Sequence, residues 1–299
     1  MRCLHTGIDR LHVTVASWLT PPVFRHGLDS PSLQQHLEAV RFTLPPLTQG
    51  CRYPLITHTL AGQLSAGLQL RRASQPDLPV VIYHHGIAEM PYDKSFRGIF
   101  RTRLLTQAHF VALRAPFHRS WFDLIHGLAT LNSFLAMCAV SIKLIEAVRR
   151  LMLGAGARGC LVAGSSLGGF LSIMHHLIYG TADSYTPLLA GPDLAHTMLH
   201  THYRRFLARQ ALEHPQRLKA QLDFRHAFQR SDTRRVFPLL ARYDLDMPYA
   251  HHAACFAASR VPVVTIERGH ITGLFAFSAL RTHLLAHLAR SHPNPDDAS

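Results

Sequence analysis

Short apolar runs alternate with longer segments of helical spacing from about residue 50 onward. Residues 53–72 have the pattern of a pair of strands, and the apolar runs at residues 78–86 and 109–117 are typical of buried strands. Apolar positions recur at helical spacing in residues 93–107 and 128–153, and each of these segments follows one of the buried runs. This part of the chain therefore predicts strands that alternate with helices.

The same alternation returns near the C-terminus. The predicted elements are a strand at residues 160–164, a helix after Ser166, a strand at 235–244, a helix at 247–260, a strand at 261–270 and a helix at 275–289. Repeated strand–helix units of this kind predict a mainly parallel sheet with helices on both faces, which is an α/β fold.

The alternation lapses between residues 187 and 235. This segment is helical in period, rich in Arg and His, and predicts two or three inserted helices. We therefore expect an α/β core of residues 1–186 and 236–299 and a helical cap, or lid, of residues 187–235. The first 50 residues or so match no pattern that we can assign and are treated as an N-terminal extension of the core.

Composition narrows the class of protein. A chain of 299 residues with 47% hydrophobic content can bury a large core. Its five cysteines are scattered and form no C-x-x-C pair, which indicates free thiols and a cytoplasmic location. The apolar residues 11–19 lack a signal cleavage site, and the uncharged residues 124–142 continue into a helical period, so we expect neither a signal peptide nor a transmembrane segment.

The formal net charge of +13 comes almost entirely from arginine. The arginines are dispersed, Arg204, Arg205 and Arg209 of the cap included, and they form no run of five basic residues. Because no nucleic-acid-binding motif is present either, we expect a basic solvated surface and no nucleic-acid partner. Contact with an anionic surface at the periphery of the protein stays open.

The stretch "GSSLG" matches the pattern G-x-S-x-G with Ser166 at its centre, since Gly164 and Gly168 have the required spacing. The apolar run before it and the helix after it supply the strand, sharp turn and helix of a nucleophile elbow. Ser165 lacks such flanking glycines and is the small neighbour in the turn. The helix beginning at Leu167 would direct its N-terminal dipole towards an anion formed beside Ser166.

A serine hydroxyl needs a general base, and the base needs an orienting carboxylate. His270 follows the last predicted strand and a glycine, and Asp244 and Asp246 follow the strand before it. The order Ser, Asp, His, with each residue at a strand end, is the arrangement that such a triad requires in this type of fold.

On these motifs the chain resembles the α/β-hydrolase superfamily from about residue 78 to residue 289. The resemblance implies the α/β-hydrolase fold and a catalytic triad. The triad acid of the superfamily commonly lies in a D-x-x-V-P loop, so "DLDMP" favours Asp244, with Asp246 as the alternative. The pair His85 and Gly86 matches the H-G pair after the third strand, which implies an oxyanion hole made by the backbone N–H groups of Ile87 and Leu167.

Other polar residues have ordinary interpretations. Adjacent histidines such as His175 and His176, or His251 and His252, point about 100° apart on a helix and have no cysteine or carboxylate at a spacing that completes a zinc site, so no metal is expected. Glu89 and Asp93 either contact a substrate or cap the next helix, and His84 is an ordinary strand-end residue.

The sequence thus predicts a serine hydrolase, most simply a carboxylesterase that acts on a small-molecule acyl substrate without a cofactor. A thioester or amide hydrolase and an acyltransferase would use the same triad. A non-catalytic protein of this fold, serving in binding or as a scaffold, is the alternative from another class. Nothing in the sequence indicates the oligomeric state.

Overall fold

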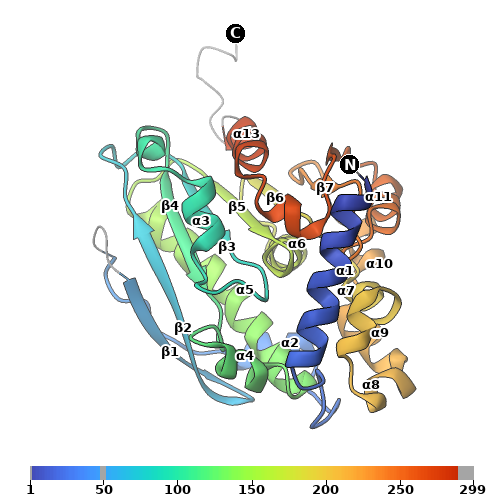
Figure 1. The fold of residues 1–299 in the computed structure, drawn as a ribbon. Helices are drawn as coiled ribbons and strands as arrows, with labels where there is room; N and C mark the ends of the chain where they lie inside the picture. The colour runs from blue at the N-terminus through green and yellow to red at the C-terminus, as the bar shows by residue number, and fades with distance from the viewer. Residues whose placement is uncertain (1, 48–51, 289–299) are drawn as a thin grey trace.

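Eight strands form one mixed, mostly parallel sheet in the computed structural model, which describes residues 2–47 and 52–288 (Figure 1). They are β1 (Arg52–Thr59), β2 (Gly62–Arg71), β3 (Val80–His84), β4 (His109–Arg114), β5 (Cys160–Ser165), β6 (Ser184–Leu188), β7 (Leu239–Ala241) and β8 (Val264–Ile266). Their order across the sheet is β1-β2-β4-β3-β5-β6-β7-β8. The β1–β2 and β2–β4 pairs are antiparallel and the remaining pairs are parallel, which confirms the predicted sheet type.

Helices cover both faces of this sheet and the ends of its strands. The α-helices are α1 (Arg2–Leu19), α2 (Leu33–Ala39), α3 (Lys94–Ile99), α4 (Trp121–Gly127), α5 (Leu131–Gly154), α6 (Leu167–Ile178), α7 (Leu194–His200), α8 (Arg209–Glu213), α9 (Pro215–Leu222), α10 (Arg225–Arg230), α11 (Tyr249–Ala258), α12 (His270–Leu274) and α13 (Phe277–Leu288). Two short 3₁₀ helices are η1 (Thr102–Thr106) and η2 (His202–Phe206).

The central strand β3 shows why its apolar run is continuous. Successive side chains of a strand point to opposite faces of the sheet. Val80 and Ile82 pack in the core layer with α5 and α6, and Val81 and Tyr83 pack in the other layer with α3 and α13. All five residues of β3 are buried, because helices cover both faces.

Helix α5 is the one helix among the described residues that is long and apolar enough to cross a membrane. However, 78% of its most apolar window is buried inside the protein, where it packs between the sheet and α2. Length and composition alone do not separate such a core helix from a membrane span. The predicted buried helix at residues 124–142 is divided between α4 and α5, and Thr130 caps the start of α5 by accepting a hydrogen bond from Ser133 N at 3.0 Å.

Other parts of the fold also differ from the sequence prediction. In the fully described stretch between β6 and β7 there are five short helical segments (α7, η2, α8, α9 and α10) instead of two or three. The predicted helix over residues 93–107 is interrupted, with α3 followed by η1, and Asp93 precedes α3 without making a side-chain capping bond. Strand β6 was not predicted, because its sequence SYTPL contains a serine, a threonine and a proline in five residues.

The N-terminal extension also takes up defined structure. Helix α1 packs against α12 and η2, and Figure 1 shows it running beside the cap helices. It therefore belongs, with the helices between β6 and β7, to the region that surrounds the carboxyl ends of the parallel strands.

Candidate active site

Ser166 lies in the sharp turn between β5 and α6, and its backbone has φ 53° and ψ −117°. A side chain at positive φ is strained by about 1–3 kcal/mol, and the neighbouring packing must hold it there. A hydrogen bond from Ser166 N to Leu188 O at 2.9 Å does part of this. A Cβ atom at Gly168 would lie 2.1 Å from His84 O, and one at Gly164 would lie 2.4 Å from the Gly168 backbone. Both glycines of the motif are therefore required by close backbone contact.

The second serine of the motif has a different surrounding. Ser165 is fully buried, and its hydroxyl accepts a hydrogen bond from Tyr83 Oη at 3.0 Å. Tyr83 also bonds to Ser95 Oγ at 2.8 Å. Ser165 thus takes part in a buried network beneath the turn.

The structure brings Ser166, His270 and Asp244 into one hydrogen-bonded chain. His270, the first residue of α12, places Nε2 3.1 Å from Ser166 Oγ and Nδ1 2.7 Å from Asp244 Oδ2. Asp244 Oδ1 accepts hydrogen bonds from the backbone N–H groups of Asp246 at 2.9 Å and Met247 at 2.7 Å. These bonds fix the Asp244 carboxylate in the turn after β7.

Asp246 occupies a different position from the one required of a triad acid. It is fully buried, yet neither of its carboxylate oxygens has a hydrogen-bond partner among the described residues. Burial, with a smaller contribution from the Asp244 and Asp9 carboxylates, raises the pKa of Asp246 to about 7. Of the two candidates, Asp244 is the one that bonds to His270.

Charges around His270 favour its protonated form. Burial lowers its pKa, but the carboxylate of Asp244, followed by those of Asp246 and Asp9, more than offsets this and raises the pKa to about 9. An imidazole in this surrounding is a strong proton acceptor once it is neutral, and the imidazolium that forms after proton transfer is stabilised.

Each predicted oxyanion-hole donor lies in a peptide unit whose carbonyl oxygen accepts a hydrogen bond, and this bond fixes the orientation of the unit. The peptide between Gly86 and Ile87 is rigid, so its N–H points opposite to its C=O. Gly86 O accepts hydrogen bonds from His85 Nδ1 at 2.7 Å and from Glu89 N at 3.2 Å. Ile87 and Ser166 line the same two cavities, and a Cβ atom at Gly86 would lie 3.5 Å from Ser166 Cβ, so the loop that carries Ile87 lies beside the serine.

The other predicted donor is at the start of α6. Ser166 O accepts the helical hydrogen bond from Phe170 N at 3.0 Å, so the Leu167 N–H of the same peptide points out of the helix N-terminus. Both predicted donors are thus oriented by bonds to the carbonyl of their own peptide unit.

His85 orients the loop that carries Ile87. Its Nε2 accepts a hydrogen bond from Ala115 N at 3.1 Å, so Nδ1 must carry the proton that it donates to Gly86 O. Burial, together with the neighbouring His118 and His84, keeps the pKa of His85 well below its usual value, and the ring is therefore neutral. His118 supports the same loop through a hydrogen bond from Nε2 to Ile87 O at 2.7 Å.

Glu89 lines the larger cavity beside Ser166, but its carboxylate is already engaged. It accepts hydrogen bonds from Ser95 N at 2.6 Å and from Gly86 N at 3.3 Å, and burial raises its pKa. Glu89 therefore ties the loop after β3 to helix α3. Asp93 instead forms ion pairs with Arg52 and Arg97, both at 3.3 Å.

Asp9 of α1 is a residue of this site that sequence reasoning did not find. It is fully buried, and its carboxylate accepts hydrogen bonds from His270 N at 2.8 Å, Ile271 N at 3.1 Å and Leu245 N at 3.4 Å. One side chain thus holds the loop of the base and the loop of the acid together. The available signal was the spacing of His5, Asp9 and Val13, which places the one acidic residue of α1 on its buried face.

We expect Asp9→Ala to lower the free energy of unfolding by about 3 kcal/mol, because it leaves buried N–H groups without an acceptor. Displacement of His270 should lower kcat for the reaction proposed below by about 10²-fold. Urea unfolding and ester hydrolysis measure the two effects. Asp29→Ala, which removes an acid whose side chain is 95% exposed, is the control and should leave both quantities near wild type. Equal behaviour of the two variants would show that Asp9 does not position the loops.

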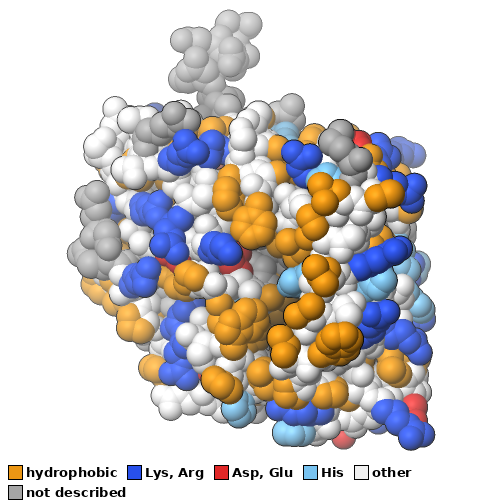
Figure 2. Space-filling view, viewed as in Figure 1, with side chains coloured by type: hydrophobic (Ala, Val, Ile, Leu, Met, Phe, Trp, Pro, Cys, Tyr) orange, Lys and Arg blue, Asp and Glu red, His pale blue; other side chains and the backbone are white. Residues whose placement is uncertain are grey.

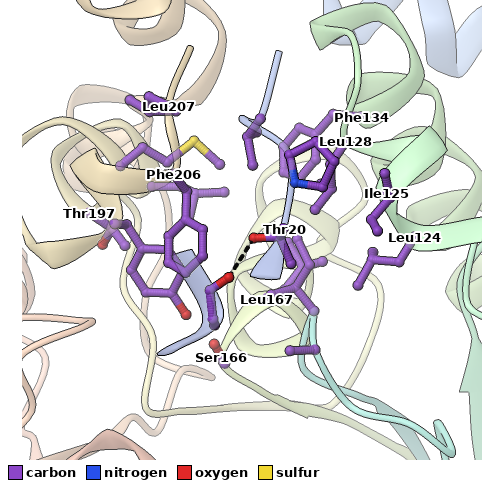
Figure 3. A pocket seen from close by; sticks show the side chains of 18 of the residues that line it. Thr20, Leu124, Ile125, Leu128, Phe134, Ser166, Leu167, Thr197, Phe206 and Leu207 are labelled. Atoms are coloured by element: carbon purple, nitrogen blue, oxygen red, sulfur yellow. Dashed lines mark hydrogen bonds between the residues drawn. The ribbon is translucent and has the colours of Figure 1, made fainter. Parts of the chain in front are cut away.

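Two cavities meet at Ser166 within the described part of the protein. The smaller, of about 150 Å³, is lined almost entirely by apolar side chains from α1, α4, α5 and the cap (Figure 3). Its labelled lining residues include Leu124, Ile125, Leu128, Phe134, Leu167, Phe206 and Leu207. The larger, of about 310 Å³, contains Glu89, Lys94 and His270 and is more polar. A substrate with an apolar part and a more polar part would therefore place the bond between them at Ser166.

The structure corrects the sequence argument on metal ligands near His251 and His252. Cys255 lies close to both histidines, and Asp193 and His196 lie close to His251, with the ligand atoms of each group within 4.8 Å of one another. Asp193 and His196 could not be found from local spacing because they lie in the segment between β6 and β7, whereas Cys255 could have been, since it follows His251 by four residues on α11. The Asp193 carboxylate, however, already pairs with His251 at 2.9 Å and with Arg225 at 3.1 Å. A metal ion bound there would have to displace a guanidinium cation.

No protein-family model matches this sequence, and no curated protein is similar to it in sequence. Solved structures are similar in fold. Est1E from Butyrivibrio proteoclasticus with ferulic acid bound superposes with a TM-score of 0.56 and 14% identity over 76% of this chain and 96% of its own. For an acetyl xylan esterase from Paenibacillus sp. R4 the TM-score is 0.55, with 14% identity over 93% of each chain.

An acylaminoacyl peptidase from Pyrococcus horikoshii has a TM-score of 0.56 and 10% identity, over 81% of this chain and 41% of its own. At such identities the likeness concerns the fold and not the reaction. Together with the order and direction of the eight strands described here, it shows that this chain has the α/β-hydrolase fold.

Proposed function

We propose that this protein is a serine hydrolase that cleaves carboxylic esters through an acyl-enzyme on Ser166. The observation that carries the proposal is the hydrogen-bonded chain from Ser166 Oγ through His270 to Asp244 Oδ2, at the meeting point of two cavities. A nucleophile, a base and an orienting acid in contact are the parts that covalent acyl transfer requires.

In the proposed reaction, Ser166 Oγ attacks the acyl carbon while His270 Nε2 accepts the serine proton. The N–H groups of Ile87 and Leu167 donate hydrogen bonds to the oxyanion of the tetrahedral intermediate. His270 then gives the proton to the leaving alkoxide, and the alcohol departs. Water attacks the acyl-enzyme with His270 again as the base, which releases the acid and restores the serine. Asp244 holds the imidazole in the required tautomer throughout.

The shape of the site and the name of one similar structure support an ester as the substrate. The apolar cavity suits a hydrocarbon acyl or alcohol group, and the larger cavity leaves room for a polar remainder. The acetyl xylan esterase carries an esterase name, although an acylaminoacyl peptidase has the same fold. A thioester, an amide or a second acyl acceptor would be handled by the same residues. The assembled triad argues against a purely non-catalytic scaffold.

A fluorophosphonate probe tests the proposal directly. The serine oxygen displaces fluoride from phosphorus, so an active serine becomes covalently labelled. We expect one adduct per chain, mapped by peptide mass spectrometry to Ser166, and no adduct in Ser166→Ala. Ser165→Ala is the matched control and should still be labelled. Absence of an adduct on the folded wild-type protein, or an adduct that persists in Ser166→Ala, would overturn the proposal.

A further inference from the structure

Helix α1 is turned with its apolar side outward. Its buried face carries His5, Asp9 and Val13, while Leu11, Val15 and Trp18 form a stripe on its exposed face. The exposed fractions of these last three residues are 65%, 42% and 81%. A helix that packs on a protein in water normally buries its apolar stripe and exposes its charges. The inner polar residues serve the active-site loops, which leaves the outer apolar face without a partner among the described residues.

Further exposed apolar side chains lie at the end of α1 and at the start of α4, where the two cavities beside Ser166 open; we call this opening the active-site entrance. Trp121 and Phe122, at the start of α4, are 51% and 78% exposed, and Leu19 at the end of α1 is 77% exposed. Trp121 lines both cavities at Ser166. We call the set Leu11, Val15, Trp18, Leu19, Trp121 and Phe122 the entrance face. Contiguous exposed apolar surface of this kind marks an interaction site.

The composition of the entrance face suits a lipid–water interface. Both tryptophans of the chain, Trp18 and Trp121, belong to the entrance face. Tryptophan is favoured at such an interface because it combines a large apolar ring with a polar N–H. Among the described residues, the large apolar side chains that are exposed outside α1, α4 and the lining of the larger cavity are few: Ile56, Leu60 and Val264.

Positive charge accompanies the apolar side chains. Arg10 is exposed on α1, Arg205 lies against it with a hydrogen bond to Thr14 Oγ1 at 3.1 Å, and Lys94 lies 4.9 Å from the ring of Phe275 at the larger cavity. The one acid of α1, Asp9, is fully buried. Figure 2 shows hydrophobic side chains gathered about a hollow on this side of the molecule, with Lys and Arg around them and few acidic side chains.

We propose that the entrance face binds the surface of an anionic lipid bilayer, with α1 lying in the interface and the active-site entrance facing the lipid. We choose an anionic bilayer as the partner because the basic side chains beside the apolar helix face would be attracted electrostatically to anionic headgroups. A second copy of this chain would bring two basic faces of a protein with net charge +13 together. The proposal is independent of the ester chemistry, since Ser166 takes no part in the binding.

Tryptophan fluorescence and co-sedimentation with vesicles test the proposal. We expect the full chain to bind phosphatidylcholine vesicles that contain phosphatidylglycerol, with emission shifted to shorter wavelength, and to bind pure phosphatidylcholine vesicles at least about tenfold more weakly. High salt should weaken the binding. The double variant Leu11→Glu, Trp18→Glu should lose binding by at least about tenfold, because it places charge in the apolar stripe.

The double variant Ile56→Glu, Leu60→Glu is the matched control, since both residues are similarly exposed but lie on β1 and the turn after it. It should bind like wild type, as should Ser166→Ala, and circular dichroism melting should show that every variant is folded. No binding of wild type to anionic vesicles, or equal loss in both double variants, would overturn the proposal. So would a dimer in light scattering that Leu11→Glu, Trp18→Glu dissociates, because the face would then belong to a second copy.

Discussion

Replacing Ser166 by alanine is expected to lower kcat for ester hydrolysis by about 10⁶-fold, the size of the loss when the nucleophile of a comparable triad is removed. The hydroxyl is the atom that attacks the acyl carbon, and its nearest partner is His270 Nε2 at 3.1 Å. The change leaves Cβ in place, so the turn and both cavities should persist. Residual hydrolysis should come from the oxyanion donors and from substrate binding alone.

Burst kinetics on a chromogenic ester measure this effect, since a stoichiometric burst reports the acyl-enzyme. Ser165→Ala separates the two serines of the motif. It should keep kcat within about tenfold of wild type and lower the free energy of unfolding by about 1 kcal/mol, because Tyr83 loses a hydrogen-bond acceptor. A burst that survives in Ser166→Ala and disappears in Ser165→Ala would reverse the assignment.

The meeting of Ser166, Asp244 and His270 could be predicted from sequence because all three residues lie just beyond the ends of parallel strands. Ser166 follows β5, Asp244 follows β7 and His270 follows β8 closely, and the carboxyl ends of parallel strands meet at one edge of the sheet. The two glycines around Ser166 carry a second signal, because no larger residue fits there. Local pattern and sheet topology were sufficient to bring these three residues together.

Asp9 could not be found in this way, because its partners are distant in sequence. Its carboxylate bonds to backbone groups 236, 261 and 262 residues further along the chain. A buried acid on an amphipathic helix has no local pattern that reports what it will hold. The outward apolar stripe of α1 further obscured the pattern, because hydrophobic periodicity indicates the buried face only when the buried face is the apolar one.

The orientation of the predicted oxyanion-hole donors also depends on tertiary structure. The H-G pair marked the loop, but the direction of the Ile87 N–H follows from the hydrogen bond of His85 to Gly86 O. The tautomer of His85 is in turn set by Ala115 N, which follows strand β4. That contact exists only because β4 lies beside β3 in the sheet.

Asp244→Asn is expected to lower kcat at neutral pH by about 10⁴-fold. Asp246→Asn, in contrast, is expected to raise the rate of hydrolysis at neutral pH. An amide at position 244 would donate its N–H to His270 Nδ1 and favour the tautomer with the proton on Nε2, which cannot accept the serine proton. Asp246 makes no hydrogen bond to His270, so its replacement removes only a nearby charge. Hydrolysis rates of the two variants under identical conditions decide between the two acids.

The pH dependence of kcat/KM explains why Asp246→Asn should raise the rate at neutral pH. His270 must be neutral to act as a base, so kcat/KM should rise with pH through its pKa of about 9 and be lost below it. Asp246→Asn lowers that pKa by removing a negative charge, which should move the acidic limb to lower pH and raise the rate at neutral pH. Because the pKa of Asp246 is raised from 3.8 to about 7 in the folded protein, the free energy of unfolding should fall as pH rises between these two values and level off above about 7. Asp246→Asn should therefore also flatten the decline in the free energy of unfolding over this range.

An acidic limb that stays in place in Asp246→Asn, with kcat reduced about 10⁴-fold, would instead identify Asp246 as the acid that orients His270.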